Sequence, residues 1–138
     1  MADDLEAMKE QVIGCAITVH RSLGPGLLES IYRDCLALEL RAAGFAVERE
    51  RRVPVRYRDQ SVGGSLKVDL VVDQRLIVEV KAVEHLHPVF FAQVITYLKM
   101  TGFPVGLLMN FNSVTLLSGL RTAIHPDLYR APTSEPET

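Results

Sequence analysis

Three charged residues, Asp69, Glu79 and Lys81, interrupt two short apolar runs of this chain. Both runs are rich in Val, Ile and Leu, and the polar segment 73–75 separates them, so the pattern predicts a β-hairpin. Counting back from that loop places Asp69 directly opposite Glu79. Because side chains alternate along a strand, Lys81 projects from the same side as Glu79. The sequence therefore predicts two carboxylates and an amine on one patch.

This patch suits a divalent cation. Opposed residues of an antiparallel pair have Cβ atoms roughly 4.5–5.5 Å apart, and like charges there are destabilising unless an ion lies between them. Two carboxylates and a few waters fit Mg²⁺ or Mn²⁺, which can polarise a phosphoryl oxygen while the Lys81 ammonium stabilises negative charge. Hydrolysis of a phosphodiester is the chemistry expected. On spacing alone, a solvated strand face with one ion pair explains the same residues equally well.

Further motifs carry a resemblance to a known family. An acid on one strand followed by E-x-K on the next resembles the PD-(D/E)xK nuclease superfamily. Residues 23–32 match the motif G-x-x-E-x-x-Y, which names the GxxExxY branch of that superfamily, through Gly26, Glu29 and Tyr32. Matches to the family continue in order, so that the resemblance extends from about Val12 to about Arg121.

The resemblance implies an α/β (α+β) fold, in which helices flank a central mixed sheet with a restriction-endonuclease-like PD-(D/E)xK core. It implies a metal site for Mg²⁺ or Mn²⁺ built from Asp69, Glu79 and the helical Glu29, with Lys81 as a further catalytic residue. The expected function is a divalent-metal-dependent nuclease that hydrolyses DNA. The alternative is a catalytically inactive nuclease-fold module that binds nucleic acid or a protein partner, since fold alone does not establish function.

Two helical pairs are candidates for the site and for binding substrate. Glu29 and Tyr32 lie on neighbouring positions of a predicted helix, where Glu29 in the first turn is also explained by the helix dipole. Gln93 and Tyr97 are four residues apart beside the apolar stripe of another helix, similar to the Q-x-x-x-Y motif of several nucleases, although a polar shoulder explains them as well. We expect Tyr32, Gln93 and Tyr97 to contact the substrate.

A basic cluster between residues 49 and 58 is the expected phosphate contact. The net charge of −2 offers a polyanion no global attraction, so a DNA surface must be local. Arg52 and Arg56 would share one face of an extended segment. The alternative is an edge strand whose charges block pairing with other chains.

The elements that position these residues follow from apolar spacing and turn residues. We expect a first helix of about 18 residues before Gly24, a second helix that ends at Gly44, and a third from about Pro88 to Thr101. The core face of the second helix is expected to carry Leu28, Ile31, Cys35, Leu38 and Ala42, and that of the third helix Phe91, Val94, Ile95 and Leu98. We also expect a strand at 53–57 and a turn at Gly63–Gly64. A final hairpin should join a strand at 105–111 to one at 114–118.

Composition sets the remaining expectations. The 138 residues, 48% of them hydrophobic, suit one domain over residues 1–130 and a disordered tail over 131–138. No apolar stretch is long enough to span a bilayer and the acidic start lacks a signal-peptide pattern, so we expect a cytoplasmic protein without membrane contact. Cys15 and Cys35 are expected to be buried free thiols. The small size leaves little room for a recognition domain, so a homodimer or a larger protein partner is expected.

Overall fold

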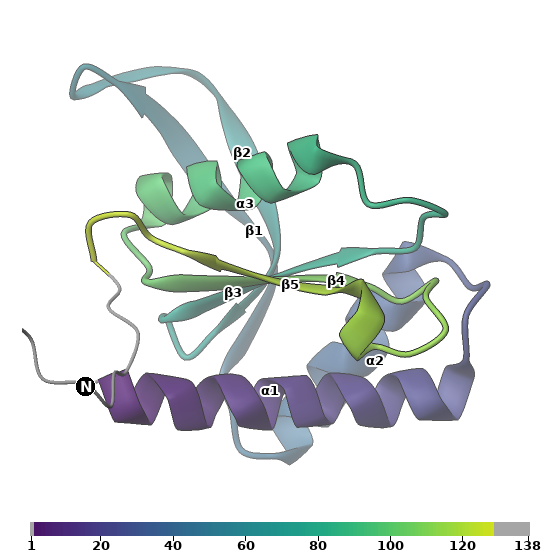
Figure 1. The fold of residues 1–138 in the computed structure, drawn as a ribbon. Helices are drawn as coiled ribbons and strands as arrows, with labels where there is room; N and C mark the ends of the chain where they lie inside the picture. The colour runs from purple at the N-terminus through teal and green to yellow at the C-terminus, as the bar shows by residue number, and fades with distance from the viewer. Residues whose placement is uncertain (1, 129–138) are drawn as a thin grey trace, which may run out of the picture.

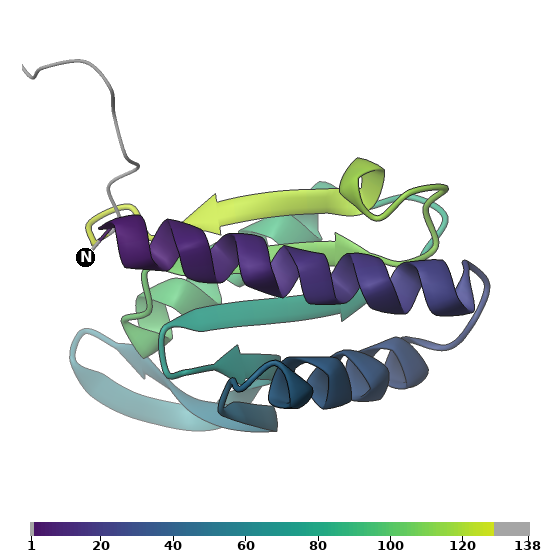
Figure 2. The same cartoon turned by 90° about the horizontal axis from the view of Figure 1, so that it is seen from below.

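The computed structural model describes residues 2–128, and the expected tail at 131–138 lies outside them. The elements are α1 (Ala2–Leu23), α2 (Glu29–Ala42), β1 (Val47–Tyr57), β2 (Gln60–Val72), β3 (Leu76–Lys81), α3 (Pro88–Thr101), β4 (Val105–Asn110), the 3₁₀ turn η1 (Leu117–Gly119) and β5 (Leu120–Ile124). The strands form one sheet in the order β1-β2-β3-β4-β5, antiparallel except for the parallel pair β3–β4. Helices α1 and α2 cover one face and α3 covers the other (Figures 1 and 2). The predicted mixed sheet flanked by helices is confirmed.

The two faces of β3 belong to different parts of the core. Leu76, Val78 and Val80 are buried with α1 and α2, whereas Ile77 is buried with α3. Because side chains alternate, Glu79 and Lys81 share the side of Ile77. The hairpin therefore directs these two charged residues toward α3.

Helix α3 packs directly against the sheet at Gly106. A Cβ atom added at Gly106 of β4 would lie 2.5 Å from Val94 Cγ1, so only glycine allows this approach. The predicted range of the helix is confirmed, with His87 Nδ1 accepting a hydrogen bond from Val89 N at 3.1 Å at its start. The predicted core stripe is correct for Val94 and Leu98, which are buried, and Ile95 is half-buried against the same cluster. It is wrong for Phe91, which is 37% exposed.

The predicted core face of α2 is wrong. Its buried residues are Tyr32, Leu36, Ala37 and Leu40, and the expected row of five residues from Leu28 to Ala42 lies on the outward side. Both rows have helical spacing, so the periodicity could not choose between them. Packing decides, because the Tyr32 ring stacks on Phe111 of the sheet end at a centroid distance of 4.8 Å.

Three strand predictions also need correction. β1 begins at Val47 instead of Val53, and the turn before the hairpin is formed by Arg58 and Asp59, both with positive φ. Gly63–Gly64 lies inside β2, beside a register shift between Pro54 and Arg56. The last strand is β5 instead of 114–118, because that segment forms a turn and enters η1.

Cys15 and Cys35 are free thiols, but both are half-buried instead of fully buried. Burial, followed by the charge of Glu39, raises the pKa of the Cys15 thiol. No helix within residues 2–128 combines the length and apolar character needed to cross a bilayer.

Candidate active site

Asp69 and Glu79 meet where β2 and β3 part. The strands pair from Val72–Leu76 to Leu70–Val78, the predicted register, and backbone pairing stops there. At the next position side chains replace the ladder: Asp69 N donates to Glu79 Oε1 at 2.9 Å, and Val80 N donates to Asp69 Oδ2 at 2.8 Å. The predicted juxtaposition of the two carboxyl groups is present.

Glu79 is only 5% exposed. Burial, and next the negative charge of Asp69, raise the pKa of Glu79 from 4.5 to about 8, while the Asp69 amide and the charge of Lys81 act in the opposite direction. Near neutral pH a proton therefore occupies the site in the absence of another cation. A metal ion would supply the same positive charge.

The donor set fits a hard divalent cation. A backbone amide uses one oxygen of each carboxyl group, which leaves Asp69 Oδ1 and Glu79 Oε2 as the oxygens that can face an ion. Within the described residues, no group of three or more His, Cys, Asp or Glu side chains gathers around a common point. The protein would thus supply two oxygen ligands and water the others, a pattern usual for Mg²⁺.

Lys81 lies on the same side of β3 and acts electrostatically on Glu79. Its Nζ atom is 4.5 Å from the centroid of the Phe90 ring, a cation–π contact. The half-buried Phe90 belongs to the first turn of α3. An aromatic ring thus holds the ammonium beside the acidic pair.

The two predicted residues of α3 differ in exposure: Tyr97 is half-buried and Gln93 is exposed. Burial, and then the charges of Glu79 and Asp69, raise the pKa of Tyr97, so its hydroxyl lies within the field of the acidic pair. Gln93 is exposed one turn closer to the start of α3. Of these two residues, Tyr97 is the one with an electrostatic link to the acidic pair.

Glu29 is brought to the same end of the sheet but stands outside the acidic pair. Glu29 is exposed in the first turn of α2. Arg33 lies one turn later, and the negative charge of Asp69 favours the charged form of its guanidinium. The two residues share one side of the helix. The structure therefore keeps Glu29 out of any three-acid cluster of the described residues, one helical turn from Arg33.

Tyr32 does not face a substrate. Its side chain is fully buried, and its hydroxyl donates to Gly24 O at 2.5 Å and accepts from Leu27 N at 3.1 Å. The expectation that Tyr32 binds substrate is replaced by a structural role, because these bonds fix the turn between α1 and α2.

An ion-pair network joins α2, β1 and β2 beside Asp69, and no sequence motif predicts it. Glu50 Oε1 accepts from Arg33 Nη1 at 3.0 Å and lies 3.3 Å from Lys67 Nζ. Glu50 has a positive φ of 52° and falls opposite Asp69 in the β1–β2 register. Only the tertiary fold brings α2, β1 and β2 together here, so no spacing pattern could have revealed it.

The β1–β2 ribbon turns over at this point. Arg49 pairs with Asp34 of α2 at 2.9 Å, whereas Arg51 lies over the Phe103 ring, 5.6 Å from its centroid, after α3. Asp69 therefore marks the root of a two-stranded arm, residues 52–67, which extends beyond α3 (Figure 1).

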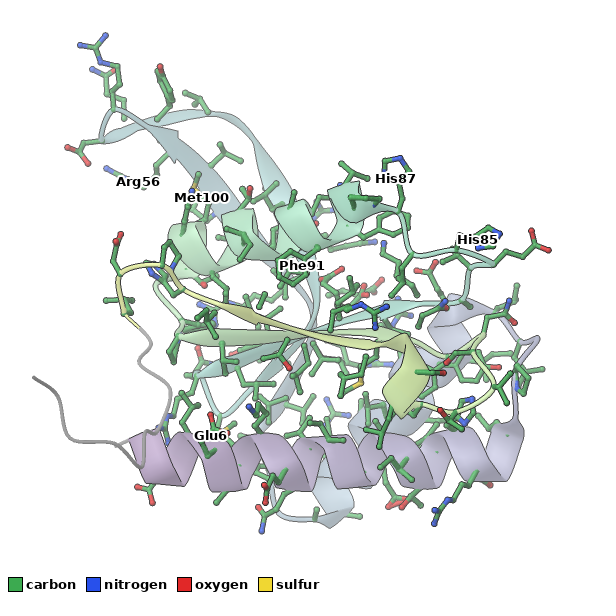
Figure 3. All side chains as sticks on the ribbon, viewed as in Figure 1. Glu6, Arg56, His85, His87, Phe91 and Met100 are labelled. Carbon is green, nitrogen blue, oxygen red and sulfur yellow. The ribbon has the colours of Figure 1, made fainter. Side chains whose placement is uncertain are left out.

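The arm is basic although the chain is acidic overall. It contains four basic residues and one acidic residue, while the net charge of the chain is −2. Arg52 donates to Ser65 Oγ at 3.3 Å, and Arg56 donates to Asp59 O at 2.7 Å. Figure 3 places Arg56 on the outer part of the arm. The register shift lies between these two arginines, and β1 is also an edge strand, as the alternative reading of this segment expected.

Comparison with known families agrees with this geometry. The model of the PD-(D/E)XK nuclease superfamily matches residues 6–122. The chain belongs to this superfamily. The matched range of the PD-(D/E)XK domain includes Asp69, Glu79 and Lys81. Comparisons with curated proteins and with solved structures found no match.

Proposed function

We propose that this PD-(D/E)XK protein is a divalent-metal-dependent nuclease that hydrolyses DNA phosphodiester bonds. The observation that carries the proposal is the pair of amide hydrogen bonds that hold the two carboxyl groups together: Asp69 N donates to Glu79, and Val80 N donates to Asp69. Superfamily membership supports nuclease chemistry. We further propose membership of the GxxExxY branch, supported by Gly26, Glu29 and Tyr32.

In the proposed mechanism Asp69 and Glu79 hold Mg²⁺ or Mn²⁺, and the Asp69 and Val80 amides keep both carboxyl groups oriented. The bound ion would polarise the phosphodiester and lower the pKa of a water molecule. Lys81 positions the attacking water or stabilises the additional negative charge on the phosphoryl group. Its contact with Phe90 limits the motion of the ammonium.

The α3 side of the site is proposed to position the substrate. The Tyr97 hydroxyl is half-buried near the acidic pair, where it can donate to a phosphate oxygen. Gln93, one turn away and exposed, can reach the neighbouring nucleotide. Glu29 is proposed to assist from the start of α2, through water held at the ion.

The arm is proposed to bind the DNA backbone next to the site. A two-stranded β-ribbon fits the major groove of a duplex, and arginines contribute affinity by neutralising phosphates. Arg52 near the root and Arg56 farther out would contact phosphates at different distances from the cleaved bond. We expect R52A and R56A each to weaken DNA binding and to reduce its salt dependence, whereas R21A on α1 leaves both unchanged.

Hydrolysis of labelled DNA tests the chemistry. Cleavage should require Mg²⁺ or Mn²⁺ and should be lost in D69A and K81A. The matched controls E10Q and K99A change exposed charges on α1 and α3 and should cleave normally. Equal cleavage by K81A and the parent, with both proteins folded, would contradict the mechanism.

Calorimetric titration with Mn²⁺ separates an enzyme from the inactive module. Binding that D69A abolishes, together with cleavage, supports the nuclease. Failure of Mn²⁺ to bind the intact protein would favour a module that retains the fold and binds nucleic acid or protein.

We also propose a cytoplasmic location. Cys15 and Cys35 are both free thiols, the state that reducing compartments maintain. Measurement of the compartment by fractionation tests this directly.

A further inference from the structure

A polar pocket lies at the carboxyl ends of β3 and β4, outside the acidic pair. Its volume is about 320 Å³, and its walls come from the loop after β3, the loop after β4, η1 and β5. The carboxyl ends of neighbouring parallel strands are a common position for a ligand. The polar side chains of its lining include Glu84, His85, Asn110, Asn112, Ser118 and Arg121.

The register of the sheet connects this pocket to the acidic pair. Lys81 of β3 is the register partner of Asn110 of β4. Glu79 falls in one row with Leu108 and Arg121, so Arg121 and Glu79 share the face on which α3 packs. Two strand spacings separate them, which is roughly 10 Å. The pocket therefore begins beside Lys81, on the side away from the β1–β2 arm.

Donor groups of the pocket remain free within residues 2–128. Asn110 is only 5% exposed, and its amide nitrogen carries two hydrogens. One of them is donated to Val83 O at 2.9 Å, and no described acceptor takes the other. Arg121 donates to two backbone carbonyls, and no described carboxylate pairs with its guanidinium. The exposed His85 lies on the loop after β3 (Figure 3). An anion would supply acceptors for these donors.

A phosphate carried by DNA fits the pocket better than a free anion. The planar guanidinium of arginine matches phosphate oxygens. The exposed Glu84 opposes an anion, so the pocket alone would bind free phosphate weakly. A strand already held at the arm delivers its own phosphates at high effective concentration. Each strand carries a phosphate about every 3.4 Å of helix axis, so the roughly 10 Å to Glu79 corresponds to about three phosphates.

We propose that this pocket, through Arg121 and Asn110, binds a backbone phosphate of the DNA strand a few nucleotides from the cleaved bond. The inference rests on the proposed nuclease function, because it takes the acidic pair as the cleavage site. The arm and the pocket then hold the strand on both sides of Lys81.

Anisotropy titration of a labelled duplex with the full chain, in chelator and at several salt concentrations, tests the pocket. R121A should weaken binding about tenfold, as expected for a lost charge-assisted hydrogen bond. It should also reduce the slope of log K against log salt by about 0.9, the value for one phosphate contact. The control R21A removes an exposed arginine of α1 and should change neither quantity. Circular dichroism checks that R121A is folded.

E84Q provides a test of opposite sign. Removing the acidic side chain of the lining should tighten DNA binding about two- to fivefold, which a merely structural role of the pocket would not do. The matched control E10Q removes the same charge from an exposed site on α1 and should leave the affinity unchanged. Inorganic phosphate at constant ionic strength should not displace the duplex.

The outcomes separate this pocket from the nuclease proposal. R121A that binds like R21A, E84Q that binds like E10Q, displacement by inorganic phosphate, or a parent that binds no DNA would each overturn the pocket. Cleavage by the parent is measured independently, in Mn²⁺. A parent that cleaves while R121A binds like R21A keeps the nuclease and removes the pocket. A parent that shows the expected binding changes without cleavage supports the pocket in an inactive module.

Discussion

Replacing Glu79 with Gln should change how stability depends on pH. In metal-free wild-type protein the folded state holds a proton on Glu79 between pH 4.5 and about 8, whereas the unfolded chain has released it. The unfolded state therefore binds fewer protons, and the free energy of unfolding falls as pH rises through this window. Below the window both states are protonated and above it both are ionised, so the penalty is complete only above about pH 8.

The structure sets the size of this effect. One proton contributes a slope of at most about 1.4 kcal/mol per pH unit, so the window from 4.5 to about 8 corresponds to on the order of 5 kcal/mol. E79Q remains neutral and keeps an oxygen that can accept from the Asp69 amide. The variant should match wild type near the acidic end of the window and become progressively more stable than wild type toward the alkaline end.

Urea unfolding with a metal chelator, at pH steps across the window, measures the difference directly. Comparing two proteins that differ only at residue 79 cancels the titration of all other groups that do not contact it. Parallel stability curves for E79Q and wild type would refute the reasoning, because they would mean that Glu79 is ionised in the folded protein throughout. Near the alkaline end of the window, adding Mn²⁺ should raise the free energy of unfolding of wild type. It should leave the free energy of unfolding of E79Q unchanged.

Three further predictions concern the surrounding framework. G106A should destabilise the fold by about 1–3 kcal/mol because its Cβ would lie 2.5 Å from Val94 Cγ1; in thermal unfolding the control G14A, where a Cβ meets nothing within 4 Å, should be neutral or stabilising. Y32F should cost about 1–3 kcal/mol in urea unfolding, because it removes both hydroxyl hydrogen bonds, and should leave Mn²⁺ affinity unchanged; reduced affinity with intact stability would instead indicate a site role. Mn²⁺ should raise the melting temperature of wild type and not of D69N, and an equal rise in both would place the ion elsewhere.

The hairpin register was predictable because the site depends on local pairing. Val72 opposite Leu76 follows from a short polar loop, and every subsequent pair follows by counting. The period-2 alternation then fixed the common side of Glu79 and Lys81. What counting could not show is that the ladder stops at Leu70, since the divergence of the strands comes from the turnover of the β1–β2 ribbon.

The other errors share a cause, which is that they depend on contacts between distant segments. Two rows of α2 have helical spacing, and the stack of Tyr32 on Phe111 selects one of them. The apolar character of residues 114–118 suggested a strand, but Gly119 allows the chain to pass close to β4, where an added Cβ would lie 2.4 Å from Asn110 O. The resemblance to a family predicted the layers correctly, whereas these tertiary choices required coordinates.

The reversal of the β1–β2 ribbon at Asp69 divides β2 into a part that belongs to the main sheet and a part that belongs to the arm. Toward the loop at 73–75, β2 is fixed by β3; beyond Asp69 it pairs with β1 alone. The outer part of the ribbon can consequently be lengthened, shortened or exchanged for another hairpin without altering the distance between the two carboxyl groups. Variation among relatives, and engineering of new target preferences, would find their most permissive position there.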